Sequence, residues 1–184
     1  MNYDYILALD PSGSYHEGKG TTGWNVYSCL DRRVIHAGSI TAKDYTCMEA
    51  YWDAQLALIA KYHERFKDRL VVVIEDYLLY ATQAQNQINS RMETCKLIGA
   101  IQHYCWICKI PYVMQTAREV KARWTDDILT YKHIIKKRGK NFYVPINMKT
   151  KITHHCIDSI RHSVHYATFK NETKGAVQDA YRKS

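Results

Sequence analysis

Proline and glycine are scarce in this sequence, which has only three prolines and eight glycines among its 184 residues. With 46% hydrophobic residues, the composition excludes a fibrous or disordered chain and suits a compact protein with a buried core. Long apolar runs are missing too, because no segment has about 18 consecutive apolar residues, and the N-terminus carries no signal-peptide pattern. We therefore expect neither membrane insertion nor export, and predict a cytoplasmic protein.

Acidic residues are also in the minority, since 26 Lys and Arg outnumber 18 Asp and Glu and give a formal net charge of +8. This excess points to a polyanionic partner, with nucleic acid the first interpretation and an anionic membrane surface the second. The length suits one domain and leaves little room for another. We predict a single domain over residues 1–170 and a polar tail over residues 171–184.

Six cysteines are scattered through apolar segments, and without an export signal they are expected to be reduced thiols. Cys105 and Cys108 form a CxxC motif, but it lies in a predicted helix and no second pair follows at zinc-finger spacing. Core packing is the favoured interpretation of this pair, and a redox or zinc role is the weaker alternative.

Hydrophobic periodicity predicts an α/β domain with a mixed sheet. Alternating or continuous apolar runs predict strands, of which the fourth is aliphatic enough to be covered on both faces. Apolar residues at spacings of three and four predict helices. The expected strands are 5–9, 21–28, 33–41, one within "RLVVVIEDYLLY" that runs into two acids, and 112–116, and the expected helices are about 45–67, 89–108, a helix from 117 and 151–169.

Two of the predicted strands end in acids, Asp10 on the first and Glu75 on the fourth. A carboxylate at the end of a buried strand is costly to desolvate unless it meets a cation or hydrogen-bond donors. Side by side, the two would suit Mg²⁺, which prefers oxygen ligands. Asp76 is the alternative to Glu75, but successive strand residues point to opposite faces, so only one of them can join Asp10. A capping role for Asp10 and a surface position for Glu75 are the other interpretation.

The last predicted helix carries His155 and Asp158, which are three residues apart and project from one face. An imidazole and a carboxylate there could face the acids at the strand ends. His154 lies four residues before Asp158 and is an alternative ligand. Taken singly, a histidine such as His155 is more often a surface or packing residue, and an aspartate such as Asp158 is more often solvated.

The stretches "ILALDPSGS", "TTGWNVYS", "VVVIEDYLLY" and "HHCIDSIRHSVHYA" together resemble the RuvC family of Holliday junction resolvases, within the ribonuclease H-like superfamily. Asp10 matches the family's first acid, Gly23 the glycine of the second strand and Glu75 the glutamate of the fourth. His155 and Asp158 match the pair on the final helix. "QTAREVKARW" also resembles the family's entry into the preceding helix, where a P-x-x-V-K pattern is usual.

The sequence departs from the family pattern at three places. Ser12 replaces a glycine, residues 15–21 look like an insertion, and His155 stands where many members have aspartate. These differences resemble a diverged, phage-encoded type, which implies the cytoplasm of a bacterium or of a phage-infected host cell.

The resemblance implies a ribonuclease H-like fold, with a mixed five-stranded sheet flanked by helices. It implies a structure-selective endonuclease that resolves Holliday junctions or related branched DNA by two-metal phosphodiester hydrolysis. Asp10 would be shared by two Mg²⁺ ions, Glu75 and Asp158 would hold one each, and His155 would bind the second ion or position water. Mn²⁺ is an alternative, because it accepts imidazole more readily than Mg²⁺.

Basic segments are expected to contact DNA phosphates, although a solvated helix face is the alternative. By the resemblance, the "YLLY" segment after the fourth strand would enter the junction centre, where an apolar side chain can wedge between base pairs, and core packing is the alternative. Helix 89–108 would form a homodimer interface. The predicted DNA-binding residues are Arg118, Lys121, Arg123, Lys132, Lys136, Lys137, Arg138 and Lys140, with Tyr77, Leu78 and Tyr80 in the "YLLY" segment.

Three rival functions share parts of this pattern. An actin-like ATPase also has an acid followed by a small-residue turn, but it needs two such domains and about twice this length. A branched-DNA-binding or architectural protein could keep the fold and charge without catalysis. Other ribonuclease H-like nucleases, such as those that cut RNA in hybrids with DNA, use the same acids.

Overall fold

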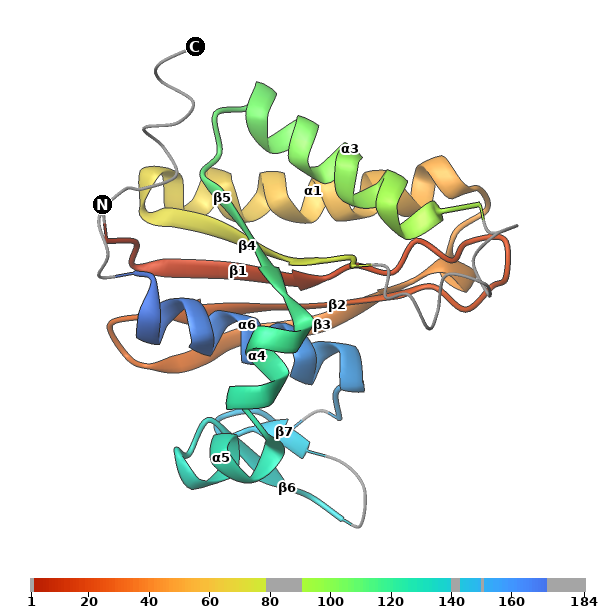
Figure 1. Cartoon of the computed structure of the whole chain (residues 1–184). Coiled ribbons are helices and arrows are strands. Elements are labelled where there is room, and N and C mark those ends of the chain that lie inside the picture. Colours follow the sequence, from red (N-terminus) through yellow and green to blue (C-terminus); the bar gives the residue numbers. More distant parts are fainter. Residues whose placement is uncertain (1, 79–90, 140–142, 150, 172–184) are drawn as a thin grey trace.

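The chain folds into a mixed five-stranded sheet with helices on both faces, which confirms the predicted fold class (Figure 1). The structure is a computed structural model, and it describes residues 2–78, 91–139, 143–149 and 151–171. The sheet has the order β3-β2-β1-β4-β5; β2 is antiparallel to both β1 and β3, whereas β1, β4 and β5 are parallel. The strands are β1 (Tyr5–Asp10), β2 (Thr21–Ser28), β3 (Arg33–Thr41), β4 (Leu70–Asp76) and β5 (Tyr112–Thr116).

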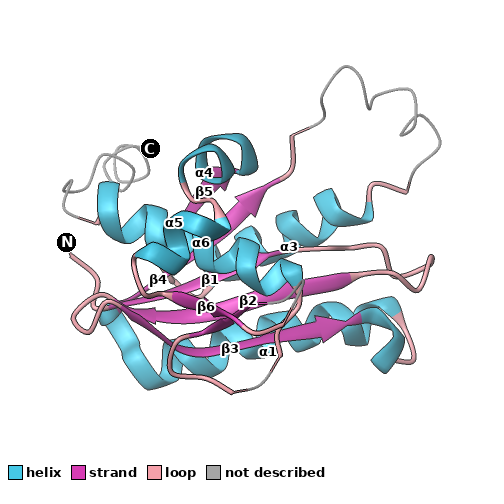
Figure 2. Ribbon diagram, turned by 90° about the horizontal axis from the view of Figure 1, so that it is seen from below, coloured by secondary structure: helices cyan, strands magenta, loops and turns pink. Residues whose placement is uncertain are grey.

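Helices α1 (Met48–Phe66) and α3 (Glu93–Ile107) cover one face of the sheet, and α6 (His154–Phe169) crosses the other (Figures 1 and 2). The α6 helix begins where the Thr153 hydroxyl accepts a hydrogen bond from the backbone NH of Cys156 at 3.3 Å. Single 3₁₀ turns flank α1, at Ala42–Asp44 and Lys67–Arg69, and the short α4 (Ala117–Arg123) follows β5 directly. The first four residues of the predicted helix 89–108 are not helical or lie outside the described residues.

Successive side chains of a strand point to opposite faces of the sheet, so they pack either under α6 or under α1 and α3. Ile6 and Ala8 of β1 pack in the core beneath α6, whereas Leu7 and Leu9 pack in the core beneath α1 and α3. The same alternation in β4 places Val71 and Val73 under α6 and their neighbours under α3. Asp10 therefore emerges on the α6 side of the sheet.

A small lobe follows α4 and was not predicted (Figure 1). It consists of α5 (Asp126–Tyr131) and a two-stranded sheet of β6 (Ile135–Lys137) and β7 (Tyr143–Pro145). Ile134 and Ile135 are buried and join the core beneath α6. These two residues sit inside the most basic stretch of the sequence, which is why the pattern indicated a phosphate-binding surface there and no packed elements.

The two ends of the described fold are joined next to the sheet. The Asn171 side chain accepts a hydrogen bond from the Tyr3 backbone NH and donates one to its carbonyl, both at 2.9 Å. Asn171 is buried, so the packed part of the chain includes it. Among the described helices, none has the length and apolar character needed to traverse a bilayer.

Gly23 allows α6 to lie directly on the sheet. It pairs with Asp10 across the β1–β2 ladder, and a Cβ atom at this position would lie 2.1 Å from the carbonyl carbon of His155. Any larger residue would have to push the first turn of α6 away from the strand. The glycine thus sets how close His155 comes to Asp10.

Replacing Gly23 with alanine is expected to lower the free energy of unfolding by about 2 kcal/mol, because the added methyl group overlaps the α6 backbone. Gly99→Ala is the matched control, since Gly99 lies in α3 with open space around it. Alanine there should stabilise the helix by about 0.5–1 kcal/mol. Urea unfolding of both variants measures this, with the oligomeric state checked by light scattering. Equal stability of the two variants would contradict the close packing of α6 on β2.

Candidate active site

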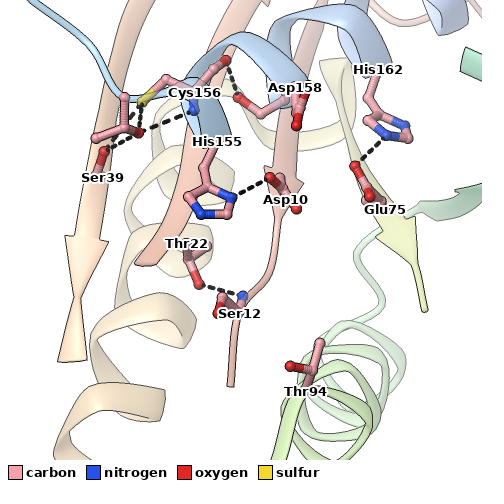
Figure 3. Close-up of polar contacts among 12 residues, drawn as sticks. Asp10, Ser12, Thr22, Ser39, Glu75, Thr94, His155, Cys156, Asp158 and His162 are labelled. Carbon is pink, nitrogen blue, oxygen red and sulfur yellow. Dashed lines mark hydrogen bonds and ion pairs between the residues drawn. The ribbon is translucent and has the colours of Figure 1, made fainter. Parts of the chain in front are cut away.

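Three carboxylates and a histidine meet at the carboxyl ends of β1 and β4, beneath the first turns of α6 (Figure 3). Nδ1 of His155 lies 2.8 Å from Oδ2 of Asp10. Asp10 and Asp158 are buried, and Glu75 is largely shielded. The structure therefore brings together the four residues that the sequence singled out, Asp10, Glu75, His155 and Asp158.

The two alternatives named from the sequence lie outside this cluster. His154 is exposed and stacks its ring near that of His155, with 4.0 Å between the ring centroids. Burial raises the pKa of the Cys95 thiol in α3, and the charge of Asp76 raises it further, which agrees with the strand alternation that turns Asp76 to the opposite face of the sheet from Glu75. The strand alternation thus selects Glu75 over Asp76.

Lys121 places a cation beside two of the carboxylates. Its Nζ lies 3.0 Å from Oδ2 of Asp158 and 3.6 Å from Oε1 of Glu75. Partial burial would lower the pKa of this amine, but the charges of Glu75 and Asp158 outweigh burial and raise it. The sequence assigned Lys121 to DNA phosphates. It lies in α4, however, and because this helix follows β5 directly, the amine reaches the acid cluster.

Arg161 holds Asp158 from the other side. Its guanidinium forms ion pairs with Asp158 and with Asp126 at the start of α5, and its Nε donates to the carbonyl oxygen of Trp124 at 2.8 Å. One side chain therefore links the acid cluster to the small lobe. Sequence reasoning missed Arg161, because its partners come from three separate elements.

His162 is a second residue that the sequence reasoning missed. It is fully buried, with Nε2 at 2.8 Å from Oε2 of Glu75 and Nδ1 at 3.0 Å from Oε1 of Gln115. A signal was present, since His162 lies four residues after Asp158 and so shares its helix face.

The pKa shifts follow from the crowding of charge. Burial raises the pKa of Asp10, the negative charges of Glu75 and Asp158 raise it further, and the hydrogen bond from His155 opposes them. That hydrogen bond is also the main cause of a raised pKa for His155. Burial alone would raise the pKa of Glu75, but the hydrogen bond and charge of His162, with Lys121, lower it. The group is therefore an anionic cluster held by protein cations.

The turn after Asp10 is fixed from two sides. The backbone NH of Ser12 donates to Oγ1 of Thr22 at 3.1 Å (Figure 3). The backbone NH of Gly13 donates to Oγ1 of Thr94 at 3.0 Å. Within the 15–21 stretch, His16 forms an ion pair with Glu93 of α3. This stretch, which the sequence indicated as an insertion, therefore docks the turn after Asp10 onto the start of α3.

The donor set matches a divalent cation in chemistry. Carboxylate oxygens with an imidazole nearby suit Mg²⁺ or Mn²⁺, and the mutual repulsion at Asp10 is the kind of strain that a divalent cation relieves. As the side chains stand, no three of the described His, Cys, Asp or Glu residues converge on one point, and the ammonium of Lys121 contacts two of the carboxylates instead. The carboxylate and imidazole groups therefore fit such an ion in chemical type, and the ion would compete with Lys121 for Glu75 and Asp158.

The predicted phosphate-binding residues occupy different surroundings. Residues 121 and 123 are two apart and do not share a helix side, and the Arg123 guanidinium lies over the Phe169 ring at 5.0 Å. The Lys132 ammonium lies over Trp124 at 5.9 Å, and Lys136 donates to the carbonyl of Ile146 at 2.6 Å. The remaining described ones, Arg118, Lys137 and Arg138, are exposed.

The "YLLY" segment and the end of the basic stretch are described only in part. Tyr77 is half-buried and packs against the core beneath α3, whereas Leu78 is 45% exposed. Tyr80 and Lys140 lie outside the described residues.

The CxxC pair is split between core and surface. Cys105 is fully buried in the core beneath α3, and Cys108 is exposed. All six cysteines are free thiols, which agrees with the expected reduced state. Burial raises the pKa of the Cys105 thiol to about 12, the opposite of what a redox-active cysteine needs. The core-packing interpretation holds for Cys105.

Comparison with known proteins gives structural likeness only. No protein-family model and no curated protein matches this chain in sequence. Among solved structures, Thermus thermophilus RuvC in complex with a Holliday junction substrate is similar with a TM-score of 0.63 and 14% identity, covering 90% of this chain and 93% of that one. A further T. thermophilus RuvC structure gives a TM-score of 0.57 at 13% identity, covering 89% and 93%. The chain therefore has a RuvC-like, ribonuclease H-like fold.

Native-state alkylation tests the cysteine assignment. At pH 8, Cys47 and Cys108 should react with iodoacetamide, because both are exposed, while Cys105 should stay unmodified. A thiol whose pKa is about 12 is ionised in only about one molecule in ten thousand at that pH. Peptide mass spectrometry after unfolding and a second label reads out each site. Rapid labelling of Cys105 in the folded protein would contradict its burial.

Proposed function

We propose that this protein is a metal-dependent, structure-selective endonuclease that cuts Holliday junctions or related branched DNA. The observation that carries the proposal is the meeting of Asp10, Glu75, His155 and Asp158 at one end of a RuvC-like sheet. The likeness to T. thermophilus RuvC, whose structure includes a Holliday junction substrate, supports the substrate class. The net charge of +8 agrees with a DNA substrate.

Each residue of the cluster has a distinct task in this proposal. Asp10, Glu75 and Asp158 would hold two Mg²⁺ or Mn²⁺ ions, which when bound activate water and stabilise the leaving 3′ oxygen. His155 orients Asp10 through the 2.8 Å hydrogen bond and can accept a proton from water at its remaining nitrogen. Lys121, released from the carboxylates, would bind the phosphate being cut.

The small lobe would place the DNA relative to the cluster. It carries Lys137 and Arg138 on its exposed side, and Arg161 ties its first helix to Asp158. Phosphate contacts from Lys137 and Arg138 would position the DNA strand without reading its bases. Selection of branched DNA over linear duplex would then come from the arrangement of the two active sites of a homodimer.

A second candidate function has its own supporting observation. Lys121 and Arg161 already neutralise the carboxylates, and among the described residues no three ligands converge. A branched-DNA-binding protein that does not cut would have this arrangement. Catalysis and binding therefore need to be measured separately.

Junction cleavage tests the proposal. A labelled four-way junction should be cut by the wild-type protein with Mg²⁺ or Mn²⁺, and Asp10→Asn should slow cutting by at least about a hundredfold, because the shared metal ligand is lost. Binding of the junction in Ca²⁺ should persist in this variant. Gel electrophoresis of the products, beside flap and linear duplex DNA, measures both.

Asp53→Asn is the matched control, since Asp53 is an exposed acid on α1, which covers the opposite face of the sheet from α6. It should cut at the wild-type rate. Tight junction binding by the wild type with no cutting in any metal would favour the non-catalytic function. Cutting of RNA–DNA hybrids in preference to junctions would instead point to another ribonuclease H-like activity.

Homodimer formation is part of the proposal, because two sites are needed to cut opposing strands of a junction. The end of α3 exposes large apolar side chains, with Trp106 66% and Ile107 58% exposed. A second copy packed on this end of the helix would bury both.

Changing Trp106 and Ile107 together to glutamate should convert a dimer into a monomer, because two charges would be buried at the contact. Light scattering coupled to size exclusion measures the mass. Leu30→Glu is the control, because Leu30 is 88% exposed in the β2–β3 turn and should leave the dimer intact. A monomeric wild-type protein would refute this interface.

A further inference from the structure

Glu75 is the carboxylate of the cluster whose position depends most on its neighbours. A glutamate side chain has one more rotatable bond than an aspartate, so its carboxylate needs an anchor to keep one orientation. Its two oxygens have different partners here. Oε2 is 2.8 Å from Nε2 of His162, while Oε1 is 3.6 Å from Nζ of Lys121. One oxygen is thus held from behind, and the other faces the centre of the cluster.

His162 is itself held in place. Its side chain is fully buried, and its Nδ1 lies 3.0 Å from Oε1 of Gln115 on β5, which is also buried. Gln115 pairs with Glu75 across the β4–β5 ladder. The three side chains are therefore linked by two hydrogen bonds across α6, β4 and β5, and neither bond depends on an exposed loop (Figure 3 shows the His162–Glu75 contact).

The donor and acceptor in each of these two hydrogen bonds follow from the chemistry of the groups. Because a carboxylate accepts, His162 donates to Glu75 from Nε2, and in its neutral form the ring presents an acceptor at Nδ1. The amide nitrogen of Gln115 has no hydrogen-bond partner among the described residues. Turning this amide by 180° lets it donate to Nδ1, so that Gln115 donates to His162 and His162 donates to Glu75.

We propose that Gln115 and His162 are positioning residues for Glu75, which fix one carboxylate oxygen so that the other is presented to a divalent cation. The proposal rests on the metal-dependent function proposed above. Partners that orient a metal ligand change metal affinity when they are removed, whereas a buried pair that only fills the core changes stability alone. Metal affinity therefore separates the two roles.

Mn²⁺ binding to the DNA-free protein is the experiment, followed by electron paramagnetic resonance of the free ion. His162→Leu should weaken binding by about 10- to 100-fold, because Glu75 loses its anchor. His162→Gln keeps a donor near Glu75 and should restore most of the affinity. Gln115→Leu, which perturbs the core less, should weaken binding by about threefold to tenfold.

His165→Leu is the matched control. His165 is buried on the same helix, but its Nε2 contacts Glu119 at 3.1 Å, away from the carboxylate cluster. This variant should bind Mn²⁺ as the wild type does, even where its melting temperature falls as far as that of His162→Leu. In junction cleavage, His162→Leu should need more Mn²⁺ for half-maximal rate, and saturating Mn²⁺ should recover the rate.

Two failures are distinguishable. Wild-type Mn²⁺ affinity in folded His162→Leu and Gln115→Leu, together with lost affinity in Asp10→Asn, would overturn the positioning role and leave the nuclease function standing. Equal Mn²⁺ binding by wild type and Asp10→Asn would overturn the metal-dependent function and this proposal with it. Near-ultraviolet circular dichroism confirms that each variant is folded.

Discussion

The repulsion among three carboxylates at one end of the sheet is the constraint on which this structure depends. Two unit charges about 4 Å apart repel by about 4 kcal/mol at the effective dielectric of a protein surface, so Asp10, Glu75 and Asp158 cannot share a shielded site without cations. Lys121 and Arg161 supply positive charge in the described structure, and His155 and His162 donate hydrogen bonds to Asp10 and Glu75. A fold that gathers such negative charge at one end of its sheet is suited to a cation-dependent reaction.

The backbone delivers this arrangement by simple means. Parallel pairing of β1 with β4 brings the ends of the two strands to one edge, and the pleat turns Asp10 and Glu75 to the same face. Gly23 removes the side chain that would keep α6 away. The helix then supplies His155, Asp158 and His162 from one stripe. Strand pairing, one glycine and one helix face are sufficient to build the cluster.

Sequence reasoning predicted the parts of the site that follow from local pattern. Strand periodicity located Asp10 and Glu75, and helical spacing located His155 and Asp158. Lys121 was assigned to DNA, because its role depends on where α4 leaves β5 rather than on its neighbours in sequence. Arg161 and His162 were missed although both share a helix face with Asp158, because their other partners are distant in sequence. The lobe over residues 126–145 was missed because Ile134 and Ile135 lie within a basic run.

Anomalous diffraction from crystals soaked in Mn²⁺ tests most directly whether the carboxylate cluster is a cation site. The account predicts a peak bounded by Asp10, Glu75 and Asp158, with the Lys121 amine moved away from its present contacts with two of them. A fully soaked crystal without such a peak, in which Lys121 keeps those contacts, would contradict it. The cluster would then be a structural ion-pair network on a RuvC-like fold.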